Sequence, residues 1–221
     1  MLRGHSVALA AILVICCCGG SDPSAPASEL TIEGWSLFGQ GLYQDAVNKF
    51  TEAIGTDSNW ADAHNGRGWS YLELRNFDSA AGDLQRVITL TGGQGQISNE
   101  ARTALGSVEN NAGDYTSASQ HLTAVIASNP EFQFTHRTSV DITDVRLLLS
   151  SALLGLSEDE TDPDSVDAYF DDIASNLNAI DTENPVYRDD PNSWKVGENW
   201  YNSFEETILE KLEWLINLYY G

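Results

Sequence analysis

Small and apolar residues recur at the spacing of one helix face in three similar stretches of the chain. The stretches read GLYQDAVNKFTEAI from Gly41, LRNFDSAAGDLQRVI from Leu74 and NAGDYTSASQHLTAVI from Asn111. In each, an aromatic residue precedes an alanine by three positions, and further apolar residues follow at helical intervals. The aromatic residues are Tyr43, Phe77 and Tyr115. Their separations of 34 and 38 residues predict a repeat of one helical unit.

A glycine lies upstream of each stretch at an equivalent position, as Gly34, Gly68 and Gly106. Glycine inside a helix costs about 1 kcal/mol relative to alanine, so three equivalent glycines need a packing reason. Two antiparallel helices approach closely only where side chains are minimal. The pattern therefore predicts pairs of helices in close contact.

This arrangement of glycine, aromatic residue and alanine resembles the tetratricopeptide repeat (TPR), a helix–turn–helix unit of 34 residues. The resemblance implies an all-α solenoid of about three to four helix pairs plus a C-terminal capping helix. The expected TPR domain spans residues 29–221. Its parts are repeats at about 29–60, 61–94 and 97–130, a degenerate repeat at 140–185 and a helix at 199–219. The last helix carries an apolar stripe that should cover the final repeat, formed by Phe204, Ile208, Leu212, Leu215 and Leu218.

The N-terminal sequence predicts export and lipid attachment. A short basic start and the apolar run from Val7 to Ile15 are typical of a signal peptide, expected at 1–17. The cysteines that end this run resemble the lipobox of bacterial lipoproteins. That resemblance implies lipidation at Cys18, with Cys17 as the fallback, and a flexible tether at 18–28. The expected location is the bacterial cell envelope, on the periplasmic or surface side; a plain secretory signal remains the alternative.

Charge and residue content limit the chemistry. The chain has 33 acidic and 11 basic residues and a formal net charge of −22, which disfavours nucleic acid as a partner. No cysteine follows residue 18, so the domain has no disulfide framework and no thiol nucleophile. The acidic run 158–172 lacks the turn glycine of a calcium loop. No metal site, cofactor or catalytic site is predicted, and an enzyme is not expected.

What the sequence favours is recognition of another protein. In the TPR family, certain positions of the first helix of each repeat face a concave groove. The resemblance assigns seven partner-binding residues to this groove: Trp35, Phe38, Asn65, Trp69, Leu72, Glu73 and Asn111. Because these positions hold no lysine or arginine, a partner should bind by apolar contact and amide hydrogen bonds. The expected function is a non-catalytic scaffold for another protein or an extended peptide, with membrane contact only through the lipid anchor.

Two alternatives stay open. Trp35 and Trp69 are expected to stand free on the concave wall, but they could instead pack against a neighbouring repeat or the tether. The chain could also bind a small molecule or glycan by stacking rings on an aromatic groove and C-terminal segment, the latter comprising Trp194, Trp200, Tyr201 and Trp214. An enzyme with an unrecognised site is a third and weaker reading.

Overall fold

The computed structural model describes residues 25–220. The expected signal peptide and the lipidation site at Cys18 or Cys17 lie outside the described residues. Among those described, no helix combines the length and the apolar character needed to cross a membrane.

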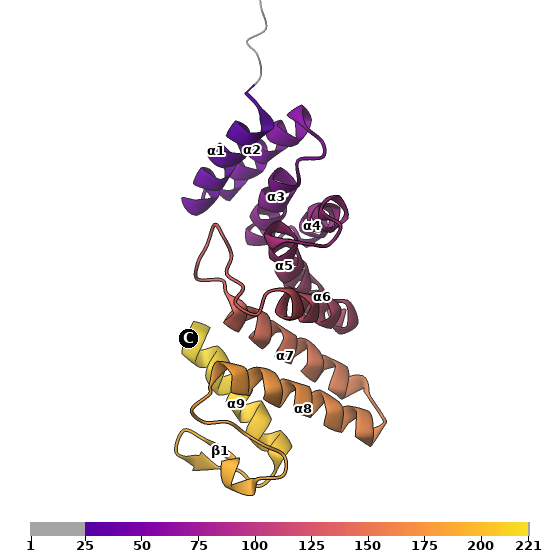
Figure 1. The fold of residues 1–221 in the computed structure, drawn as a ribbon, viewed down its shortest axis with the longest axis vertical. Helices are drawn as coiled ribbons and strands as arrows, with labels where there is room; N and C mark the ends of the chain where they lie inside the picture. The colour runs from indigo at the N-terminus through magenta and orange to yellow at the C-terminus, as the bar shows by residue number, and fades with distance from the viewer. Residues whose placement is uncertain (1–24, 221) are drawn as a thin grey trace, which may run out of the picture.

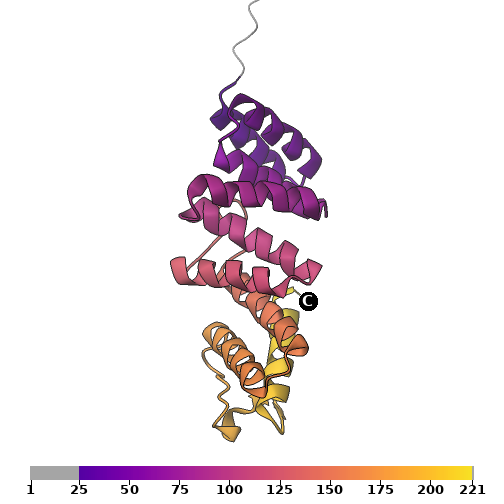
Figure 2. The ribbon, with the colours of Figure 1, turned by 90° about the vertical axis from the view of Figure 1, so that its right-hand side faces the viewer.

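Eight helices form four successive pairs that stack into an elongated array (Figures 1 and 2). Each helix packs against its pair partner, and the second helix of each pair packs against the next pair. The first helices also contact one another in a continuous row. The pairs are α1 (Ala27–Gly39) with α2 (Tyr43–Thr56), α3 (Ala61–Glu73) with α4 (Phe77–Thr91), α5 (Gln96–Ala112) with α6 (Tyr115–Ser128), and α7 (Ile142–Asp159) with α8 (Pro163–Ile180). The predicted all-α solenoid is confirmed.

The repeated glycines mark close contacts inside the pairs. A Cβ atom added at Gly68 would lie 2.8 Å from Leu84 Cγ, and one added at Gly106 would lie 2.7 Å from Leu122 Cγ. Neither distance leaves room for a methyl group beside the partner helix. The packing reason expected from the sequence is therefore present at both positions.

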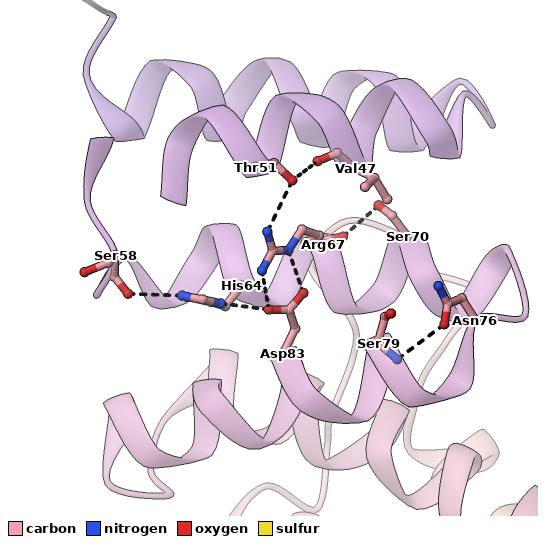
Figure 3. Close-up of polar contacts among 10 residues, drawn as sticks. Val47, Thr51, Ser58, His64, Arg67, Ser70, Asn76, Ser79 and Asp83 are labelled. Atoms are coloured by element: carbon pink, nitrogen blue, oxygen red, sulfur yellow. Dashed lines mark hydrogen bonds and ion pairs between the residues drawn. The ribbon is translucent and has the colours of Figure 1, made fainter. Parts of the chain in front are cut away.

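A buried polar cluster joins α3 to α4 and to the loop before α3 (Figure 3). Asp83 accepts hydrogen bonds from Arg67 at 2.7 and 2.8 Å. The ring nitrogens of His64 lie 2.9 Å from Asp83 Oδ1 and 3.1 Å from the carbonyl oxygen of Ser58. Burial alone would raise the pKa of Asp83, but the bonds from Arg67 and His64 outweigh it and lower that pKa.

The connection between α6 and α7 is much longer than the other connections between pairs. We call residues 129–141 the inserted segment. It extends back along the row of first helices toward α3 and α1 (Figure 1). A bond of 2.8 Å from the Phe134 amide to the Val140 carbonyl and a bridge between Gln133 and Asp141 close it into a narrow loop.

The C-terminal cap differs in its start from the predicted helix at 199–219. Residues before it form a short 3₁₀ turn, η1 (Pro191–Ser193), and a hairpin of β1 (Lys195–Val196) and β2 (Asn199–Trp200), so that α9 runs over Phe204–Tyr220. Four members of the predicted stripe are buried: Phe204, Ile208, Leu212 and Leu215. The fifth, Leu218, is 62% exposed, so inclusion of this residue in the buried stripe was wrong.

Candidate functional site

The concave wall is formed by α1, α3 and α5, and its two tryptophans are covered. Trp35 is 7% exposed and Trp69 is 4% exposed. Trp35 stacks on the ring of His136, with ring centroids 3.7 Å apart and 8° between the planes. Trp69 stacks on Phe134, at 4.2 Å and 15°. The expectation that both tryptophans stand free is therefore wrong, because the inserted segment lies over them.

Phe134 lies at the centre of this aromatic contact. Its side chain is fully buried. Besides the stack on Trp69, its ring makes edge contacts with Trp35 at 5.8 Å and with Phe38 at 6.3 Å. Aromatic pairs of this geometry contribute about 0.5–1.5 kcal/mol beyond the area they bury. The wall of the groove thus forms an aromatic slot for one side chain of the inserted segment.

A buried carboxylate holds the backbone of the same segment. Glu100 of α5 is almost completely buried, and its Oε1 accepts the amide of Thr135 at 3.1 Å. Asn65 donates to the other oxygen, Oε2, at 2.7 Å. Asn65, predicted to touch a partner, here orients Glu100. Glu100 was not identified from the sequence; its only signal was a carboxylate among the apolar positions of a predicted helix.

Arg137 brings a positive charge into a groove that was predicted to lack one. Its Nη1 donates to Glu73 Oε1 at 2.6 Å, and its Nη2 donates to Tyr43 Oη at 3.1 Å. The guanidinium also lies 4.9 Å from the centroid of the Phe38 ring, a cation–π contact. The groove helices supply the carboxylates, and the inserted segment supplies the cation.

Burial also shifts the pKa values of two groups at the Trp35 stack, His136 and Asp62. Burial lowers the pKa of His136, although the charges of Asp62 and Glu100 act in the opposite direction. Asp62 accepts a hydrogen bond from Trp35 Nε1 at 3.0 Å, and burial raises its pKa. Burial in the closed groove therefore favours a neutral His136.

The remaining predicted residues lie at the uncovered end of the groove. Leu72 is half-buried and Asn111 is exposed. Together with Glu73 and others they line a shallow pocket of about 270 Å³. The structure thus gathers five of the seven predicted residues beneath the inserted segment and leaves two accessible beside it.

The C-terminal aromatics do not converge on one ligand pocket. Trp194 donates its indole N–H to the Tyr187 carbonyl at 2.9 Å. Trp200 is 62% exposed and contacts Lys195. Only Tyr201 and Trp214 share a depression, whose other lining residues are mostly polar or acidic. The small-molecule or glycan alternative is therefore not favoured.

The described residues outside the groove include buried or half-buried histidines and carboxylates. No group of three or more potential metal ligands occurs within residues 25–220. His64 is buried, and both ring nitrogens are occupied (Figure 3). Glu109 lies 3.5 Å from His121, and burial, aided by the charge of Asp114, raises the pKa of Glu109 to about 7.

Comparison with known proteins identifies the fold. A tetratricopeptide repeat family model matches residues 33–95. A crystal structure of MamA has a TM-score of 0.57 at 19% identity, covering 74% of this chain and 82% of that one. YrrB, described as a TPR protein with an unusual peptide-binding site, gives 0.57 at 16% identity, covering 87% and 86%. The first TPR of Spaghetti (RPAP3), bound to the HSP90 peptide SRMEEVD, gives 0.51 at 19% identity, covering 61% and 96%.

No curated protein sequence matches the chain. The family model covers residues 33–95, and the architecture shared with solved TPR structures shows that the described residues have the TPR fold. These residues form a TPR solenoid with a C-terminal helical cap.

Proposed function

We propose that this protein is a non-catalytic interaction scaffold whose concave groove binds an extended segment of another protein. One observation carries the proposal: the groove already holds a non-helical segment through aromatic stacking, a backbone hydrogen bond to Glu100 and an ion pair with Glu73. These are the contacts by which a groove recognises a peptide. The peptide-bound TPR of similar fold supports the same use of the architecture.

The charge of the groove narrows the class of partner. Asp62, Glu73 and Glu100 supply carboxylates, and the whole chain has a formal net charge of −22. An acidic peptide or a nucleic acid would meet repulsion along this surface. A neutral or basic segment with aromatic side chains fits it better.

The proposed location is the bacterial cell envelope, with a lipid anchor at Cys18 or, failing that, Cys17. Support comes from the apolar N-terminal run and the cysteines that end it. Intact-mass analysis of protein extracted from membranes should show an acylated N-terminal cysteine. A soluble, unacylated form that begins within residues 19–28 would contradict the anchor.

Site-specific photo-crosslinking in native cells tests the scaffold role. A photoreactive residue placed at Asn111, at the accessible end of the groove, should capture a discrete protein partner. Gln85, an exposed residue of α4, is the matched control and should not capture it. Equal capture at both positions, or capture only at Gln85, would place the binding surface elsewhere.

A further inference from the structure

The inserted segment is longer than a helix connection needs to be, and several of its side chains are buried or half-buried, as those of a bound peptide would be. Other pairs are joined by residues 57–60 and 92–95, whereas this connection takes residues 129–141. Helix connections rarely need more than about eight residues, and longer ones without helix or strand are often functional. The inserted segment includes Phe132, Phe134 and Arg137, all of which are buried or half-buried.

We propose that the inserted segment is an internal substitute ligand. The natural partner is then an extended peptide with the same pattern, Phe-x-Phe-x-x-Arg, which replaces the segment in the groove. This inference rests on the proposed function and adds to it the chemistry of the partner and a mode of self-inhibition.

Two side chains and one backbone amide of the pattern have a defined receptor in the groove, and the first phenylalanine, Phe132, is buried in the core. The second phenylalanine occupies the slot between Trp35, Phe38 and Trp69. The arginine pairs with Glu73 and lies over the Phe38 ring. Between them, the backbone amide after the second phenylalanine donates to Glu100. A peptide with an acidic residue in place of the arginine would place like charges at Glu73.

Phe134 lies in the same buried core as the helix pairs, but its ring contacts differ from the contacts that close each pair. Leu84 and Leu122 pack inside their own pairs against the glycines of the first helices. Phe134 instead contacts side chains of α1 and α3 on the concave face. Release of the segment would therefore uncover the groove without removing the contacts that close each pair.

Attachment to the same chain makes the segment a strong competitor. A tethered ligand acts at an effective concentration on the order of millimolar. A free peptide of the same pattern must therefore displace a ligand that is always present. The wild-type protein should bind such a peptide much more weakly than a variant in which the segment no longer fits.

The test uses the full chain with three serines introduced into the segment, Phe132→Ser, Phe134→Ser and Arg137→Ser, which we call the open variant. The probe is a fluorescent peptide, EFQFTHRT, copied from the segment. Fluorescence anisotropy should show saturable binding to the open variant and at least tenfold weaker binding to the wild type. A peptide with serine at the same three positions is the matched control and should not bind.

Charge reversal tests the proposed register. Glu73→Arg in the open variant should weaken binding of EFQFTHRT at least tenfold. A peptide with glutamate in place of its arginine should restore that binding. An open variant that folds, as judged by circular dichroism, and does not bind the probe would overturn the proposal.

Hydrogen exchange of the wild-type chain keeps the proposal testable if the open variant does not fold. The amides of Phe134 and Thr135 should exchange faster than those of α5, through release of the segment alone. Equal protection would mean that the segment leaves only on global unfolding, which overturns the proposal.

Concentration-dependent dimers that exchange the segment would also overturn it, because the occupant of the groove would then be a second copy of the chain. Capture at Asn111 could still succeed in either case, so failure here is distinct from failure of the scaffold role.

Discussion

The indole of Trp69 lies parallel to the phenyl ring of Phe134, with ring centroids 4.2 Å apart and 15° between their planes. Trp69 belongs to the second repeat, whereas Phe134 lies in the connection that follows the third. The stack therefore joins parts of the solenoid that nearest-neighbour packing of repeats would not bring together. The sequence predicts an open groove, but the inserted segment of the same chain fills it.

Trp69→Ala should lower the free energy of unfolding by about 3 kcal/mol, the lower end of the usual cost of truncating a buried tryptophan. The substitution removes the ring that stacks on Phe134 and leaves a cavity in the core. Trp69→Phe keeps an aromatic ring and should cost less. Denaturant melts followed by circular dichroism measure both.

Trp200→Ala is the control for this series, since Trp200 is 62% exposed. It should change the free energy of unfolding by no more than about 0.5 kcal/mol. If Trp69→Ala were as mild as Trp200→Ala, the stack would not contribute to stability. The same result would favour the tryptophan as a free ligand contact.

The C-terminal cap should be required for stability of the last repeat. Ile208 is fully buried in α9, and Ile208→Ala should destabilise the protein by about 2–5 kcal/mol. Leu218→Ala, in the same helix but at an exposed position, should have almost no effect. Thermal melts that show equal midpoints for the two variants would make α9 an appendage to the solenoid.

Glu109 should make the protein less stable as the pH rises toward neutrality. Its pKa is raised to about 7 from an ordinary value of 4.5. The folded state therefore favours the protonated carboxyl, and this contribution is present below about pH 4.5 and lost as the pH rises through 7. Glu109→Gln, which keeps the group neutral, should raise the Tm at pH 8 by several degrees, at about 2–4 °C per kcal/mol.

Glu183→Gln is the matched control for Glu109→Gln, because it removes the same charge from an exposed site. Both variants should have similar Tm values at pH 4. A Glu109→Gln variant that gains no more than the control at pH 8 would contradict the raised pKa.

The helix pairs could be predicted because their signals are local and periodic. Gly68 and Gly106 each sit against a leucine of the partner helix, and that contact repeats with the sequence. The boundary of α9 was less predictable, since the hairpin of β1 and β2 precedes it without a strong apolar pattern.

The filling of the groove could not be predicted from repeat periodicity. Residues 131–137 follow the third repeat and have no equivalent in the other two. One signal was present: Phe132 and Phe134 alternate with polar residues in a stretch that helical spacing leaves unassigned. Apolar residues in such a loop must find a surface to cover, but the sequence does not show that this surface lies two repeats away.

The most direct test of the closed groove is the pKa of His136, measured by NMR titration of the full chain and assigned with His136→Gln. Burial against Trp35 holds this pKa below the ordinary value of about 6.5. Because burial favours the neutral ring, the contribution of His136 to closure is present above pH 6.5 and is lost as the pH falls through the lowered pKa. We expect a pKa below 6.5 in the wild type and a return to about 6.5 in the open variant. A wild-type His136 with the same pKa as His136 of the open variant would contradict the account, because the ring would then have the same surroundings with and without the closed groove.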